Sequence, residues 1–202
     1  MVNNQLTVMR LMQFDEIEQL LLQVPRIAEL RDSQPAGYVA RAAIWMDLLE
    51  QALVAAGAPE STRVDSLRGE LVFARHTVAR DAVDPPPEAN RTRKLAIDTA
   101  FAMDEAAHLA DGVLNEQRPR FVDAERRMRV LTAKVQSLGL VPAHINSPAA
   151  NQLGDVQRAI ATRPDLNAEY REIEAVLGPD DCRLLLTRAL TTAESAGVAR
   201  SG

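Results

Sequence analysis

The chain has few of the residues that build many familiar sites. Its 202 residues include one cysteine, three histidines and 3% aromatic residues. Cys182 has no second cysteine to pair with, which excludes an internal disulfide and a cysteine-based zinc cluster and agrees with a reducing compartment. Few aromatic rings are available for stacking on bases or sugars. We therefore expect a cytoplasmic protein without disulfides.

Long apolar runs and an excess of basic charge are also missing. No apolar run approaches the ~18 residues that a membrane span requires, and the first residues, MVNNQLTVMR, lack the apolar stretch of a signal peptide. The net charge is −5, from 23 basic and 28 acidic residues. This balance argues against a protein whose whole surface binds nucleic acid. We expect no membrane partner.

A repeated spacing of apolar residues is the strongest pattern that the chain does have. In four segments these residues are three and four positions apart in alternation, which places them on one stripe of a helix. A mean period near ~3.5 residues suits helices that pack side by side at shallow angles. The sequence therefore predicts an all-α fold with an antiparallel four-helix bundle as its core. The segments are 38–56, which carries Trp45, then 64–78, 95–113 and 121–138.

Glycine and proline divide these segments. Gly57 and Pro59 are expected to turn the chain after the first helix. Consecutive prolines within 84–88 separate the second helix from the third. Arg118-Pro119-Arg120 is expected to separate the third from the fourth, because proline lacks a backbone N–H and crowds the preceding turn. Connections this short predict antiparallel neighbours.

Further helices are predicted on both sides of the bundle. An N-terminal helix contains Phe14 and Ile17 and ends, or kinks, near Pro25. We therefore assign 1–139 to the helical bundle, 140–148 to an irregular connector and 149–202 to C-terminal helices. These helices are expected at about 149–162, 165–177 and 180–195, divided by Arg-Pro-Asp and Gly-Pro-Asp. We expect them to pack on the bundle as one domain, although the pattern leaves open whether they form a separate subdomain.

One short segment, FAMDEAAH, has the Glu-x-x-His spacing that di-metal helix bundles use. At about 100° per residue, Glu105 and His108 point away from the apolar stripe of their own helix, and no second Glu-x-x-His occurs. We predict a solvated face and no metal site. Ile97 and Phe101 lie beside this polar face, so we expect another helix or a partner to cover part of it.

The other chemically reactive residues lack the neighbours that catalysis requires. No Gly-x-Ser-x-Gly motif, glycine-rich phosphate loop or paired acid motif accompanies His76 or His144. Cys182 lies near a predicted helix start, where the helix dipole favours a thiolate, but Asp180 and Asp181 beside it oppose that charge. We predict an inert cysteine, no catalytic residue and no cofactor.

Residues 118–134 form the best candidate for a charged binding surface. The segment holds two acidic residues, Asp123 and Glu125, and six basic ones: Arg118, Arg120, Arg126, Arg127, Arg129 and Lys134. Charged residues beside an apolar seam usually form salt bridges with a neighbouring helix, and 47, 50 and 98 offer carboxylates for this. Asp123–Arg127 and Glu125–Arg129 also have the favourable i, i+4 order. We favour this structural role.

Three hypotheses for function follow from these patterns. The leading one is a non-enzymatic helical protein that acts through protein contacts, as an adaptor, a regulator, a complex subunit or a homo-oligomer. The second is a nucleic-acid-associated protein that uses the arginine-rich helix 118–134, extended by Arg91, Arg93 and Lys94. The third is an enzyme whose functional residues are dispersed along the chain and converge in the fold.

Overall fold

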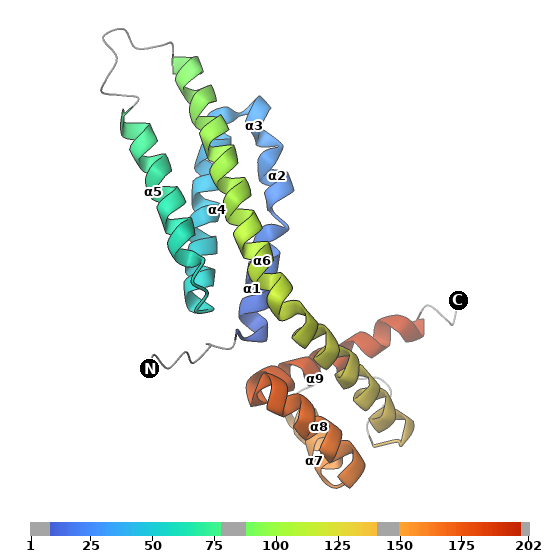
Figure 1. Ribbon diagram of the computed structural model, residues 1–202. Coiled ribbons are helices and arrows are strands. Elements are labelled where there is room, and N and C mark those ends of the chain that lie inside the picture. Colours follow the sequence, from blue (N-terminus) through green and yellow to red (C-terminus); the bar gives the residue numbers. More distant parts are fainter. Residues whose placement is uncertain (1–8, 78–87, 141–149, 199–202) are drawn as a thin grey trace, which may run out of the picture. The chain divides into compact units, whose positions relative to one another are not determined.

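The computed structural model describes residues 9–77, 88–140 and 150–198, and this part of the chain is helical, without strands. The predicted all-α class is thereby confirmed. The helices, labelled in Figure 1, are α1 (Leu11–Leu21), α2 (Val24–Ala28), α3 (Leu30–Ser33), α4 (Pro35–Ala55), α5 (Ser61–Thr77), α6 (Glu88–Ser137), α7 (Ala150–Ala161), α8 (Pro164–Leu177) and α9 (Pro179–Val198). None of these described helices is long and apolar enough to cross a bilayer. The chain divides into two compact units, Met1–Gln117 and Arg118–Gly202.

Helix α4 is the centre of the first unit, because α1, α2, α3 and α5 all pack against it. Its predicted apolar stripe is confirmed at every position. The indole Nε1 of Trp45 donates a 2.7 Å hydrogen bond to the carbonyl of Leu20 at the end of α1. Burial of this stripe thus organises the unit. Its members are Tyr38, Ala42, Trp45, Leu49, Ala52 and Ala56, all 3% exposed or less.

A tight turn returns the chain from α4 into α5. Gly57 has a φ of 69°, in the left-handed region that glycine enters without steric cost. On α5, Arg68 forms ion pairs with Asp47, at 2.7 Å, and with Glu50, both on α4. These two acids were expected as partners of the arginines in 118–134, so that assignment is wrong. Arg68 is the nearer cation because the turn brings α5 back along α4.

The predicted break at Arg118-Pro119-Arg120 is also wrong, because α6 continues through Pro119 and ends at Ser137 (Figure 1). The predicted third and fourth helices are therefore one helix, and the antiparallel four-helix bundle is not confirmed. Pro119 is solvent-exposed. The carbonyl of Asn115, which loses its intrahelical donor to the proline, also belongs to an exposed residue and can turn towards water.

The buried stripe of α6 was predicted well in its second half and partly in its first. Leu95, Leu109 and Val113, all predicted core residues, are only half-buried. Their places in the core are taken by Ala96, Met103, Ala110 and Leu114, beside the correctly predicted Thr99, Ala102 and Ala106. In the second half the predicted Phe121, Ala124, Met128, Leu131 and Val135 are buried, whereas Leu138 is 43% exposed.

The second unit contains the three C-terminal helices, which begin and end within a few residues of their predicted bounds. Pro164 and Pro179 each stand in the first turn of a helix, where the missing N–H costs nothing. Gly178, with a φ of 88°, ends α8 and allows the sharp change of direction into α9. Most of the predicted connector, including His144, lies outside the described residues.

Candidate interaction surface

The arginine-rich segment 118–134 occupies the second half of α6. Arg127 is its best-connected member: its Nε lies 2.7 Å from Glu169 and its Nη2 lies 2.5 Å from Glu172, both on α8. The hydrogen bond to Glu169, and to a smaller extent that to Glu172, raises the pKa of the Arg127 guanidinium. Arg127 therefore fastens α6 to α8, through acids that lie far along the chain and were not among the expected partners.

Arg120, Arg126 and Arg129 also have contacts within the second unit. Arg129 forms the predicted ion pair with Glu125. Asp123, expected to pair with Arg127, instead pairs with Arg126 at 2.6 Å. Arg120 lies over the Phe121 ring, 4.5 Å from its centroid, and burial lowers the pKa of this arginine, with Asp181 opposing that effect. Arg118 also has a partner, and Lys134 is exposed in the last turns of α6.

The Glu-x-x-His pair lies on α6 within the first unit. Glu105 binds Arg63 of α5, with Oε1 2.8 Å from Nε, and His108 is exposed. Both side chains thus lie outside the core, as their helical positions predicted. Within the described ranges, no three His, Cys, Asp or Glu side chains are grouped closely enough to hold a metal ion.

Cys182 and Tyr170 form a buried polar pair in the second unit. Cys182 is fully buried, and burial raises the pKa of its thiol to about 11, partly offset by a hydrogen bond with Tyr170. Burial likewise raises the pKa of Tyr170 to about 12, although the hydrogen bond from Gln157 Nε2 to its hydroxyl, at 3.1 Å, acts in the opposite direction. The thiol is therefore protonated at neutral pH and withdrawn from solvent, as expected for an inert cysteine.

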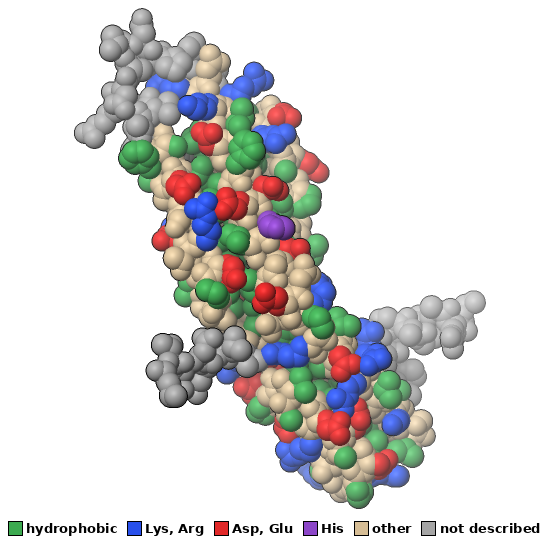
Figure 2. All heavy atoms as spheres, in the orientation of Figure 1, with side chains coloured by type: hydrophobic (Ala, Val, Ile, Leu, Met, Phe, Trp, Pro, Cys, Tyr) green, Lys and Arg blue, Asp and Glu red, His purple; other side chains and the backbone are tan. Residues whose placement is uncertain are grey.

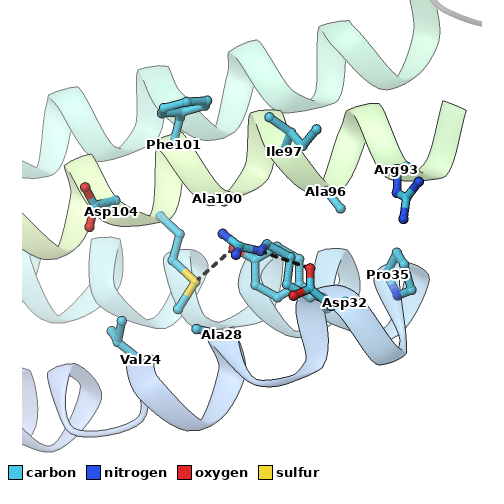
Figure 3. Close-up of a pocket in the computed structure, with 13 residues that line it drawn as sticks. Val24, Ala28, Asp32, Pro35, Arg93, Ala96, Ile97, Ala100, Phe101 and Asp104 are labelled. Atoms are coloured by element: carbon cyan, nitrogen blue, oxygen red, sulfur yellow. Dashed lines mark hydrogen bonds and ion pairs between the residues drawn. The ribbon is translucent and has the colours of Figure 1, made fainter. Parts of the chain in front are cut away.

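A groove of about 530 Å³ runs along α6 in the first unit, between α6 and the α2–α3 segment. Figure 3 shows Val24 and Asp104 at one end of the groove, and Pro35 and Arg93 at the other. Between these ends the lining is mostly small and apolar, with alanines at 28, 96 and 100. Small side chains on both walls leave room for side chains of another molecule.

The floor of the groove contains Tyr38 of α4. Its hydroxyl contacts the Sδ atom of Met103 at 3.8 Å, a weak acceptor. Burial raises the pKa of this phenol, nearby Arg31 lowers it, and Asp104 raises it further. Arg31 itself lies 3.6 Å from Asp32 on the groove edge. The floor is thus neutral and apolar, while charged groups stand at the rim.

Ile97 and Phe101 border the groove and remain uncovered. They extend from α6 on the side farther from α2 and α3 (Figure 3). Phe101 is 73% exposed and Ile97 is 50% exposed. We expected another helix or a partner to cover part of this face, and within the described residues no helix covers these two side chains. Figure 2 shows hydrophobic side chains at the surface of this unit among charged ones.

A second groove in the same unit, of about 570 Å³, is lined by residues of α2, α3 and α4. Ile44 and Leu48 reach its surface, at 63% and 44% exposed. Polar side chains make up a larger share of its lining than of the first groove, with those at positions 23, 26, 29 and 41 among its nine residues. We therefore take the groove along α6 as the candidate site. Sequence patterns had indicated it only through Ile97 and Phe101.

Comparison with protein-family models, curated proteins and solved structures finds no match for this chain.

Proposed function

We propose that the chain is a helical protein-interaction protein, not an enzyme, and that it binds its partner through the groove along α6. The observation that carries this proposal is the exposure of Phe101, at 73%, beside an open groove with an apolar lining. Exposed apolar surface that adjoins a groove and has a charged rim is typical of protein interaction sites. A buried aromatic ring is also among the commonest anchors of such interfaces.

A helix is the partner element that this groove fits. Arg93 and Asp104, at its two ends, are eleven positions apart on one helix, which corresponds to about 16 Å at the helical rise. About three turns of a partner helix therefore fit between them. Helices that bind grooves in this way present apolar residues on one face. Such an association needs no catalytic group, and we propose that it takes place in the cytoplasm.

The arginine-rich helix supports the nucleic-acid hypothesis less well. Arg126, Arg127 and Arg129 each pair with acidic residues of the same chain. Phosphate binding would have to compete with these ion pairs, and the net charge of −5 opposes it further. We therefore retain protein contact as the proposed function and leave nucleic-acid binding as a separate prediction.

A photo-crosslinking experiment tests the proposal. A benzophenone amino acid placed at position 101 in the full-length chain is expected to give a discrete crosslinked protein adduct in the producing cells. The matched control carries the same group at Phe73, which has nearly the same exposure, at 71%, but does not line the groove. We expect Ala100→Arg to remove the adduct at 101, because it fills the groove. Equal adducts at both positions, or none at 101, would contradict the proposal.

A further inference from the structure

We infer that the partner is an amphipathic helix of another protein, with an acidic residue opposite Arg93 and a basic residue opposite Asp104. This helix occupies the groove of the proposed function, on which the inference rests. The charges at the rim set the chemistry of the partner, because the phenol of Tyr38 on the floor between them is neutral. Complementary charges at an interface select the partner and fix its register.

Four charged side chains line the groove, and two of them balance each other. Arg31 and Asp32 lie 3.6 Å apart on the edge formed by α3, so their charges largely offset each other. Arg93 and Asp104 are both exposed, and within the described residues neither forms an ion pair. One end of the groove therefore carries an unbalanced positive charge and the other end an unbalanced negative charge (Figure 3).

Arg93 and Asp104 also point to the same side of α6. They are eleven positions apart, and at about 100° per residue this spacing brings the second side chain to within about 20° of the first. A partner helix that lies along α6 has the same geometry, so its facing side also repeats every eleven positions. An acid and a base at this spacing therefore meet both rim charges together, while the apolar residues between them face the apolar lining.

The helix dipole sets the order of the two charges on the partner. An acidic residue is favourable in the first turn of a helix, and a basic residue is favourable in the last turn. A segment of about three turns is only marginally helical by itself, so these end charges help it to fold. The opposite order would place both charges at unfavourable ends. We therefore expect the acid to precede the base, and the partner helix to run in the same direction as α6.

Charge reversal at the rim tests both contacts, with the yield of the benzophenone adduct at position 101 as the readout. Arg93→Glu places a carboxylate opposite the acid of the partner, and Asp104→Arg places a guanidinium group opposite its base. We expect each variant to lower the yield at least about threefold, because like charges across an interface weaken binding. Circular dichroism serves as the folding control.

Lys94→Glu and Asp111→Arg are the matched control variants. They make the same changes of charge at exposed positions of α6 that do not line the groove. Both controls should leave the adduct yield unchanged. A difference between the rim variants and these controls therefore reports contact at the rim and not the net charge of the chain.

Mass spectrometry of the adduct identifies the crosslinked segment and tests the order of the charges. We expect a helical segment with apolar residues on one face, and with an acidic residue eleven positions before a basic one. Replacement of this acid by arginine in the partner should lower the yield with the wild-type chain and restore it with Arg93→Glu. A folding defect in either protein cannot produce this recovery.

Two results overturn the inference. Rim variants that behave like their controls show that Arg93 and Asp104 do not contact the partner. A crosslinked segment without the acid and the base in this order, whether from another protein or from a second copy of this chain, excludes the inferred chemistry. In both cases an adduct at position 101 that Ala100→Arg removes still supports the proposed function, whereas absence of any adduct removes both.

Discussion

The indole nitrogen of Trp45 lies 2.7 Å from the carbonyl oxygen of Leu20, and this hydrogen bond joins the middle of α4 to the last residues of α1. The last carbonyls of a helix lack the usual i+4 donor, and the Leu20 carbonyl otherwise accepts only from the backbone N–H of Gln23, at 3.1 Å. Trp45 therefore satisfies part of the α1 terminus while its ring, 1% exposed, fills the core. Removal of the indole N–H should therefore destabilise both α1 and α4.

Trp45→Phe should accordingly lower the free energy of unfolding by about 1–3 kcal/mol, because it removes one of the two hydrogen bonds to the Leu20 carbonyl, leaving only that from the Gln23 N–H, and also removes packed volume. Urea unfolding followed by circular dichroism measures the change. The wild-type tryptophan fluorescence should also be blue-shifted, as is normal for a buried indole. Emission at the wavelength of free tryptophan would place Trp45 outside the core.

Leu131→Ala should cost about 2–5 kcal/mol, since Leu131 is 1% exposed in the second unit and its truncation leaves a cavity. Val130→Ala is the matched control: it lies next in sequence but is 52% exposed, and it should change stability by no more than about 0.5 kcal/mol. If the two substitutions have equal effects, Leu131 does not face the core and Val130 does not face solvent as described.

Pro119→Ala should stabilise the chain. The substitution supplies an N–H for the Asn115 carbonyl inside a helix that already continues through this point, and proline is about 3 kcal/mol less favourable than alanine in a helix interior. Part of this gain is offset, because alanine gives the unfolded chain more freedom, so we expect about 2 kcal/mol. Thermal and urea unfolding measure it. A loss of stability would instead assign Pro119 a structural role of its own.

Stability should fall between pH 9 and 11 because of Cys182. The unfolded thiol ionises near pH 9.0, whereas the folded thiol keeps its proton up to a pKa of about 11. The folded state thus holds one more proton in this range, so the contribution is full below pH 9 and is lost as the pH rises, by at most about 1.4 kcal/mol per pH unit. Cys182→Ala should flatten this decline in urea unfolding measured across the same range. Tyr170, with a pKa of about 12, should leave a residual slope at the upper end.

The chain should show no specific binding to RNA or DNA at ~150 mM salt, where exposed charges are screened beyond ~8 Å. Arg126, Arg127 and Arg129 are engaged with acids of the same chain. Fluorescence anisotropy with labelled oligonucleotides tests this expectation. Tight binding that is lost when these arginines are replaced by glutamine would favour the nucleic-acid hypothesis. In that case the slope of log affinity against log salt concentration should fall by about one for each phosphate contact removed.

The sequence by itself determined the helical class and the buried face of α4. Tyr38, Trp45 and Leu49 recur at helical spacing, so the local pattern locates the buried face, although the structure widens that face by burying residues 39, 46 and 53 as well. The three C-terminal helices were predictable for a similar reason. Proline at positions 164 and 179 is favourable in a first turn and unfavourable in a helix interior, which locates the breaks.

Only the tertiary structure decided where the chain departs from the conformation that its local sequence favours. Proline at 119 predicts a break by the same rule, yet α6 continues, because burial of Phe121 and Met128 on its inner face can offset the lost hydrogen bond. Arg127 finds its two glutamates on α8, far along the chain, where spacing carries no information. The groove beside Phe101 likewise exists only once α2, α3, α4 and α6 are assembled, since a shared surface depends on distances in space and not on distances along the sequence.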